Sequence, residues 1–139
     1  MVLRRIVLPI GVLVLILGLS QVVAAQWWIR VMPSILTLPS LRIFGVVDLL
    51  MGTALLAAAV RREVSLRIFV LILGVLMLLD GVARLACPAA MREAVNSFFL
   101  GRPHSSQLIM IMVRGVVRAI VGALLIYSAS KIERRSISR

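Results

Sequence analysis

Apolar residues run through the chain in four long blocks, which polar residues and prolines separate. The blocks cover about Ile6–Ala25, Arg42–Val60, Leu66–Ala86 and Leu108–Ser128. Each is close to the roughly 20 residues that a helix needs to cross the hydrocarbon core of a bilayer. The pattern therefore predicts an all-α membrane protein with four transmembrane helices, and it leaves almost no chain for a soluble domain.

Each block carries two glycines seven residues apart. The pairs are Gly11/Gly18, Gly45/Gly52, Gly74/Gly81 and Gly115/Gly122. A spacing of seven keeps both glycines on one helix face, where small residues let membrane helices approach closely. Such heptad seams are typical of a left-handed four-helix bundle. We therefore expect these eight glycines to be helix-packing positions.

The glycine pairs also indicate an internal duplication. A shift of 63 residues places the first pair on the third, and a shift of 70 places the second pair on the fourth. The simplest account is one domain, residues 1–139, made of two hairpin repeats, 1–64 and 65–139. Because each repeat has two spans, the copies would be parallel in the membrane.

The two longer connections are amphipathic rather than plain linkers. Trp27 and Trp28 stand where the first span should leave the bilayer, as in an aromatic belt. Pro33 and Pro39 then interrupt an apolar stretch that we place at the membrane interface. In the second repeat, residues 88–100 are predicted to form a short helix lying in the plane of the interface.

Composition and charge support this class of protein. Apolar residues make up 62% of the chain, the mean hydropathy is +1.12 and the pI is about 11.9. The net charge of +11 would suit a nucleic acid, but the basic residues gather before the first span, at the short middle connection and after the last span. Under the positive-inside rule, both termini are therefore cytoplasmic. We expect no nucleic-acid partner and keep anionic lipid as a candidate partner.

The first block has a second interpretation. Arg4-Arg5, the apolar run and Val23-Ala24-Ala25 also resemble a secretory signal peptide with its cleavage site. The pair Gly11/Gly18 matches the later spans, so we favour a retained transmembrane helix.

One glutamine and five charged residues lie inside the apolar blocks, away from their first two positions: Gln21, Asp48, Asp80, Arg84, Arg114 and Arg118. Charges inside a membrane are costly and normally face protein or water. Counted at 1.5 Å per residue, Asp48 lies about 9 Å from the outer end of its span, and the others reach a similar level. We expect the six to converge in the outer half of the bundle, with Asp48 bridging to Arg118.

Two roles for this cluster stay open. An ion pair can simply fix the register of the helices, which is the reading that we favour. The surplus guanidinium could instead attract an anion, a lipid phosphate or the carboxylate of a partner.

Residues for catalysis or metal binding are scarce. The chain has one histidine, His104, and one cysteine, Cys87, so neither a disulfide nor a Cys-x-x-Cys site can form. His104 has no nearby acid or cysteine with which to build a nucleophilic set. We predict no enzyme activity, no cofactor and no metal.

Short motifs resemble those of a known family. The first copy carries Trp28, Leu38-Pro39, Leu41-Arg42-Ile43-Phe44-Gly45 and Gly52, and the second carries Asp80-Gly81, Pro88, Gly115 and Gly122. This pattern is similar to the YjeT-like family, which are small two-helix inner-membrane proteins of bacteria with uncharacterised function. The chain departs from it at Leu17, Met91 and Arg114. The resemblance implies two tandem hairpins, and no functional residue is carried over.

Two functions follow as expectations. The leading one is a non-enzymatic multi-pass protein of the bacterial cytoplasmic (inner) membrane, an accessory or scaffolding subunit that contacts other membrane subunits or a second copy of itself. The alternative is a small four-helix transporter, or an anion-binding or lipid-binding protein, that uses the polar cluster. Compact exporters typically need an acid in the first span, which is missing here.

Overall fold

A computed structural model describes residues 2–137 of the chain, and this part is helical without any strand. The elements in chain order are α1 (Val2–Val23), α2 (Ala25–Ile35), α3 (Leu38–Val60), α4 (Arg67–Ala86), α5 (Pro88–Val95), the π-helical segment η1 (Asn96–Leu100) and α6 (His104–Ile137).

Four of these helices are long and apolar enough to cross a membrane, as the sequence predicted. The qualifying segments are Arg5–Val23, Leu38–Val60, Arg67–Ala86 and His104–Lys131. The last one begins four residues before the predicted block, because polar residues after Pro103 form its first turn. Residues 88–100, which the sequence predicted to be helical, form α5 and its continuation η1.

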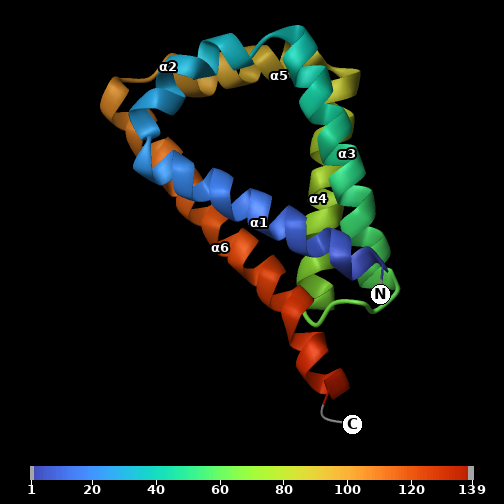
Figure 1. The fold of residues 1–139 in the computed structure, drawn as a ribbon. Helices are drawn as coiled ribbons and strands as arrows, with labels where there is room; N and C mark the ends of the chain where they lie inside the picture. The colour runs from blue at the N-terminus through green and yellow to red at the C-terminus, as the bar shows by residue number, and fades with distance from the viewer. Residues whose placement is uncertain (1, 138–139) are drawn as a thin grey trace.

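The long helices are arranged as two pairs. Helix α1 packs along α6, and α3 packs along α4, so that each helix finds its main partner in the other half of the chain. We name the pairs the α1–α6 arm and the α3–α4 arm. In Figure 1 the arms meet at the end that holds the N-terminus and diverge toward the end that holds α2 and α5. The four helices therefore form a bundle only at the converging end.

The converging end holds a core that both arms share. Val7, Leu55, Val70 and Leu125 come from the four different long helices, and each is fully buried. The connection between α3 and α4 is tied down here as well, because Leu66 N donates to Ser128 Oγ at 3.1 Å. This end fixes the angle between the arms.

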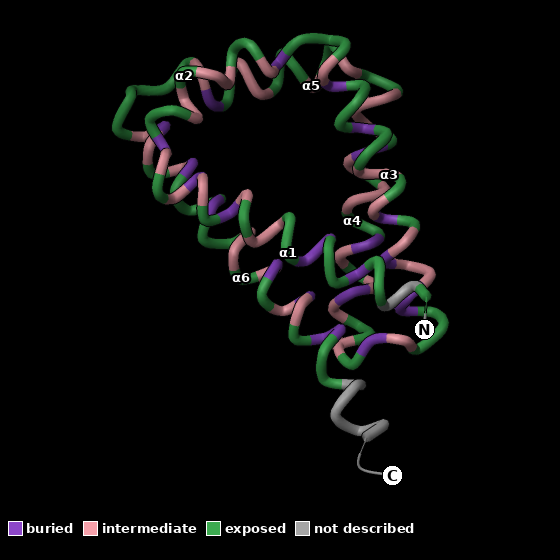
Figure 2. Tube along the Cα trace, in the orientation of Figure 1, coloured by how far each residue is buried: buried purple, intermediate pink, exposed green. Residues whose placement is uncertain are grey.

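The diverging end is spanned by the short helices. Ala25 of α2, Phe99 of η1 and Ile111 of α6 form a second buried cluster. Gln107 closes the turn before α6, since its Nε2 donates to the carbonyls of Leu100 and Arg102 at 3.2 and 2.9 Å. Figure 2 shows that buried positions otherwise follow the line of contact within each arm.

Glycine allows the two helices of each arm to touch. A Cβ built on Gly45 would lie 3.1 Å from the carbonyl oxygen of Gly81, and one on Gly52 would lie 2.9 Å from that of Gly74. The α1–α6 arm has the same contacts, because a Cβ on Gly18 would lie 2.7 Å from the Gly115 oxygen, and one on Gly122 would lie 2.8 Å from the Gly11 oxygen. A real Cβ essentially never lies closer than 3.0 Å to another heavy atom, and at 3.1 Å its neighbour would have to shift, so backbone packs on backbone.

We therefore expect Gly18→Ala to destabilise the protein. The added methyl group would collide with the backbone of Arg118 and Ala119, and such overpacking costs about 1–3 kcal/mol. Gly101→Ala is the matched control, since its Cβ would meet no atom closer than 3.3 Å. Thermal unfolding in a mild detergent should give a lower Tm for Gly18→Ala alone. Equal Tm values for the two variants would contradict the close contact of α1 with α6 at Gly18.

Candidate functional site

The acidic residues lie on the face that the α3–α4 arm turns toward the α1–α6 arm. Met77 of α4 packs against the shared core. Asp80 and Arg84 lie three and seven residues after it on the same helix. Met51 of α3 also packs against that core, with Asp48 one turn further out. Residues at these spacings share a helix face, so the inner face of the α3–α4 arm leads from the core to three charges.

The inner face of the α1–α6 arm carries only positive charges. Val121 packs against the shared core, and Arg118 and Arg114 lie three and seven residues before it on α6. Both arginines are close enough to Asp48, Asp80 and Arg84 to interact with them electrostatically. The structure thus brings together all five charged residues that the sequence placed in the outer half of the membrane.

Arg84 holds both carboxylates of its arm. Its Nη1 lies 3.1 Å from Asp48 Oδ2, and its Nη2 lies 2.6 Å from Asp80 Oδ2. The side chains of Arg84 and Asp48 are only 18% and 19% exposed, whereas that of Asp80 is 39% exposed. The contact with Asp48 is purely ionic, because its buried Oδ2 accepts no hydrogen bond within the described residues.

This pairing differs from the expected bridge between Asp48 and Arg118. The physical reason is the packing of α3 on α4, which sets Arg84 beside Asp48 while Arg118 stays on the other arm. Among the side chains that the structure describes, Arg114 and Arg118 have no partner in an ion pair or hydrogen bond. Two carboxylates against three guanidiniums leave the cluster with a formal charge of +1.

Gln21 lies apart from the ion pairs, on α1 beside Gly115. The residue is only 3% exposed, and its Oε1 accepts no hydrogen bond in the described part of the chain. It lines a cavity of about 390 Å³ together with Arg114. The other walls are apolar, from Met32, Ala94, Val95, Phe98, Phe99, Met110 and Ile111. Sequence reasoning missed this cavity, because its walls come from five elements.

The remaining expected positions lie at the ends of helices. Trp28 Nε1 donates to Ser20 Oγ at 3.3 Å, and Trp27 stands edge-on to it with 5.5 Å between ring centroids. Cys87 and His104 are both exposed. In the part of the chain whose side chains are described, no three His, Cys, Asp or Glu residues come together as metal ligands would.

Comparison with family models, with curated proteins and with solved structures gave no match. The similarity to the YjeT-like family therefore stays a prediction from short motifs.

Arg84→Leu should destabilise the protein strongly. It would leave Asp48 and Asp80 side by side without the guanidinium that pairs with both. Breaking a buried ion pair by removing one partner costs about 3–5 kcal/mol, and partial exposure places the expected loss at the lower end. Asp80→Asn should lower the stability less than Arg84→Leu does, since Asp80 is the more exposed acid. Unfolding in detergent measures both, and the double variant Asp48→Asn/Arg84→Leu should regain part of the loss. Equal stability of Arg84→Leu and wild type would contradict a stabilising role for the two ion pairs of Arg84.

Proposed function

We propose that this protein is a non-enzymatic, multi-pass accessory subunit of a bacterial cytoplasmic membrane, and that it works by holding another membrane component between its two arms. The observation that carries the proposal is the divergence of the arms. Their helices share a core at one end only, while charged inner faces extend beyond it.

Much apolar helix surface is left for contact in the diverging half. On α3, for example, Ile43 is 63% exposed, Phe44 42% and Leu50 68%. Lipid covers such surface on the outside of a membrane protein, but the inner faces also carry polar groups. Helix association in a bilayer relies on close packing and on polar contacts. A partner helix with a polar or acidic residue would match the inner faces, which have a surplus of positive charge.

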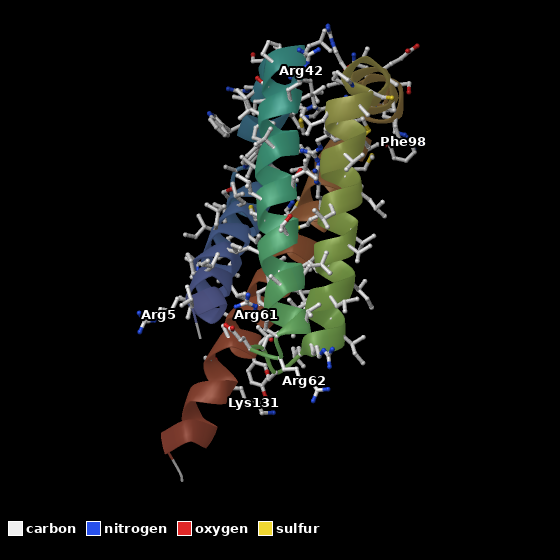
Figure 3. The ribbon with its side chains drawn as sticks, turned by 90° about the vertical axis from the view of Figure 1, so that its right-hand side faces the viewer. Arg5, Arg42, Arg61, Arg62, Phe98 and Lys131 are labelled. Atoms are coloured by element: carbon white, nitrogen blue, oxygen red, sulfur yellow. The ribbon has the colours of Figure 1, made fainter. Side chains whose placement is uncertain are left out.

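The proposed orientation has both termini in the cytoplasm. Figure 3 shows Arg5, Arg61, Arg62 and Lys131 at the converging end and Arg42 at the opposite end. The converging end also has the short connection between α3 and α4, whereas the diverging end has the long connections with α2 and α5. Positive charge near short loops marks the cytoplasmic side, which supports this orientation.

The proposal includes the duplication of a two-helix unit. Exchanging the two halves would convert the contact of Gly18 with Gly115 into that of Gly81 with Gly45, and both contacts are present. The same exchange relates the Gly11–Gly122 contact to the Gly74–Gly52 contact. This agreement supports two equivalent units whose helices pair across the repeat boundary.

Thiol labelling tests the orientation. Cys87 is the only cysteine of the chain, is exposed and follows α4 at the diverging end. A membrane-impermeant maleimide should therefore label it in spheroplasts. In the variant Cys87→Ala/Ser130→Cys, the new thiol at the exposed Ser130 should react only after the membrane is permeabilised. The reverse labelling pattern would show that both termini lie outside the cytoplasm.

Photocrosslinking tests the proposed partner site. Phe44 lies one helical turn before Asp48 on the inner face of α3, while its neighbour Ile43 points away at the same depth. A photoreactive phenylalanine analogue at Phe44 should crosslink the wild-type membrane partner in a discrete band that mass spectrometry identifies, and the same analogue at Ile43 should not. Equal crosslinking at both positions, or isolation of a lone monomer with no adduct, would rule out a partner between the arms.

A further inference from the structure

The cavity beside Gln21 and Arg114 has the size and lining of a ligand site. Its volume of about 390 Å³ falls in the lower part of the range of about 300–1,000 Å³ found for small-molecule pockets. It lies between α1, α2 and α6 on one side and α5 with η1 on the other. It is therefore at the diverging end, at the level of the in-plane helices.

Two polar groups in this cavity have no partner among the described side chains. Gln21 is nine-tenths buried or more, and its Oε1 accepts no hydrogen bond. A buried amide oxygen without a donor is unfavourable, so a hydroxyl group of a ligand would satisfy it. Arg114 has neither an ion pair nor a hydrogen bond, and a guanidinium binds phosphate or carboxylate with two parallel hydrogen bonds.

The other walls are suited to hydrocarbon. Met32 and Met110 supply flexible thioethers that adapt to irregular apolar shapes, and Phe98, Phe99 and Ile111 complete the lining. An apolar pocket with a few convergent polar groups is the usual form of a ligand site. In this cavity the convergent groups are a hydrogen-bond acceptor and a cation.

We propose that this cavity binds one anionic membrane amphiphile, whose acidic head group pairs with Arg114, whose hydroxyl donates to Gln21 Oε1 and whose acyl chain lies against the methionine and phenylalanine side chains. The carboxylates of Asp48 and Asp80 repel an anion nearby, but Arg84 pairs with both of them and offsets half of their charge. The cluster still has a formal charge of +1. This binding goes beyond the accessory role and does not depend on it.

Native mass spectrometry of the delipidated full-length protein in a non-ionic detergent tests the site. Phosphatidylglycerol is the main probe, because it has a phosphate and free hydroxyls, and phosphatidylcholine with the same acyl chains is its comparison. We expect one phosphatidylglycerol to bind about tenfold more tightly than phosphatidylcholine. Arg114→Gln should abolish this preference. Arg42→Gln, which removes the same charge at the outer end of α3, should keep it.

Further variants separate the contributions. Gln21→Leu should weaken the binding of phosphatidylglycerol severalfold. It should leave the binding of oleate, which has no free hydroxyl, unchanged. Ala94→Trp should fill the cavity and prevent binding without a change of charge, so it decides the matter if Arg114→Gln fails to fold. Inorganic phosphate should bind at least tenfold more weakly than phosphatidylglycerol.

Several outcomes would overturn the proposal. They are an unchanged preference in Arg114→Gln, an equal loss in Arg42→Gln, unimpaired binding in Ala94→Trp, and phosphate binding as tightly as the lipid.

Discussion

In both arms the backbones of two helices touch, because glycine leaves no side chain between them. The hydrophobic effect does not hold helices together in lipid, so shape and polar contacts decide which surfaces pair. Gly18 with Gly115, and Gly45 with Gly81, provide that shape. Each arm therefore closes on itself along one narrow seam. The arms have only the core around Leu55 and Leu125 in common. They diverge beyond this core because no glycine seam joins one arm to the other.

The features that depend on local pattern could be predicted from the sequence. Length and hydropathy located the four spans, since a helix must satisfy its own backbone in lipid. The heptad spacing placed both glycines of each span on one face. Helical spacing and depth were also enough to predict that Asp80, Arg84 and Arg118 lie near one another. In each case the inference used a single helix and its rise per residue.

Features that depend on which helix packs against which could not be predicted from the sequence. All four spans carry the same glycine spacing, so the sequence did not determine that α1 would pair with α6. For the same reason Asp48 was expected to meet Arg118, although Arg84 lies on the helix that packs against it. The cavity beside Gln21 was hidden for a related reason, because segments far apart in the chain form its walls.

The difference between the arms bears on the role of the charges. Under the proposed duplication, Arg84 corresponds to Gln21, and Asp48 corresponds to Arg118. The α3–α4 arm thus has a clamped ion pair where the α1–α6 arm has an amide and a guanidinium that do not bond to each other. Yet the glycine seam of the α1–α6 arm is at least as close as that of the α3–α4 arm. An ion pair is therefore not needed to set the register of such a seam, and register does not explain the unpaired guanidiniums. The proposed binding of an anionic group would explain them.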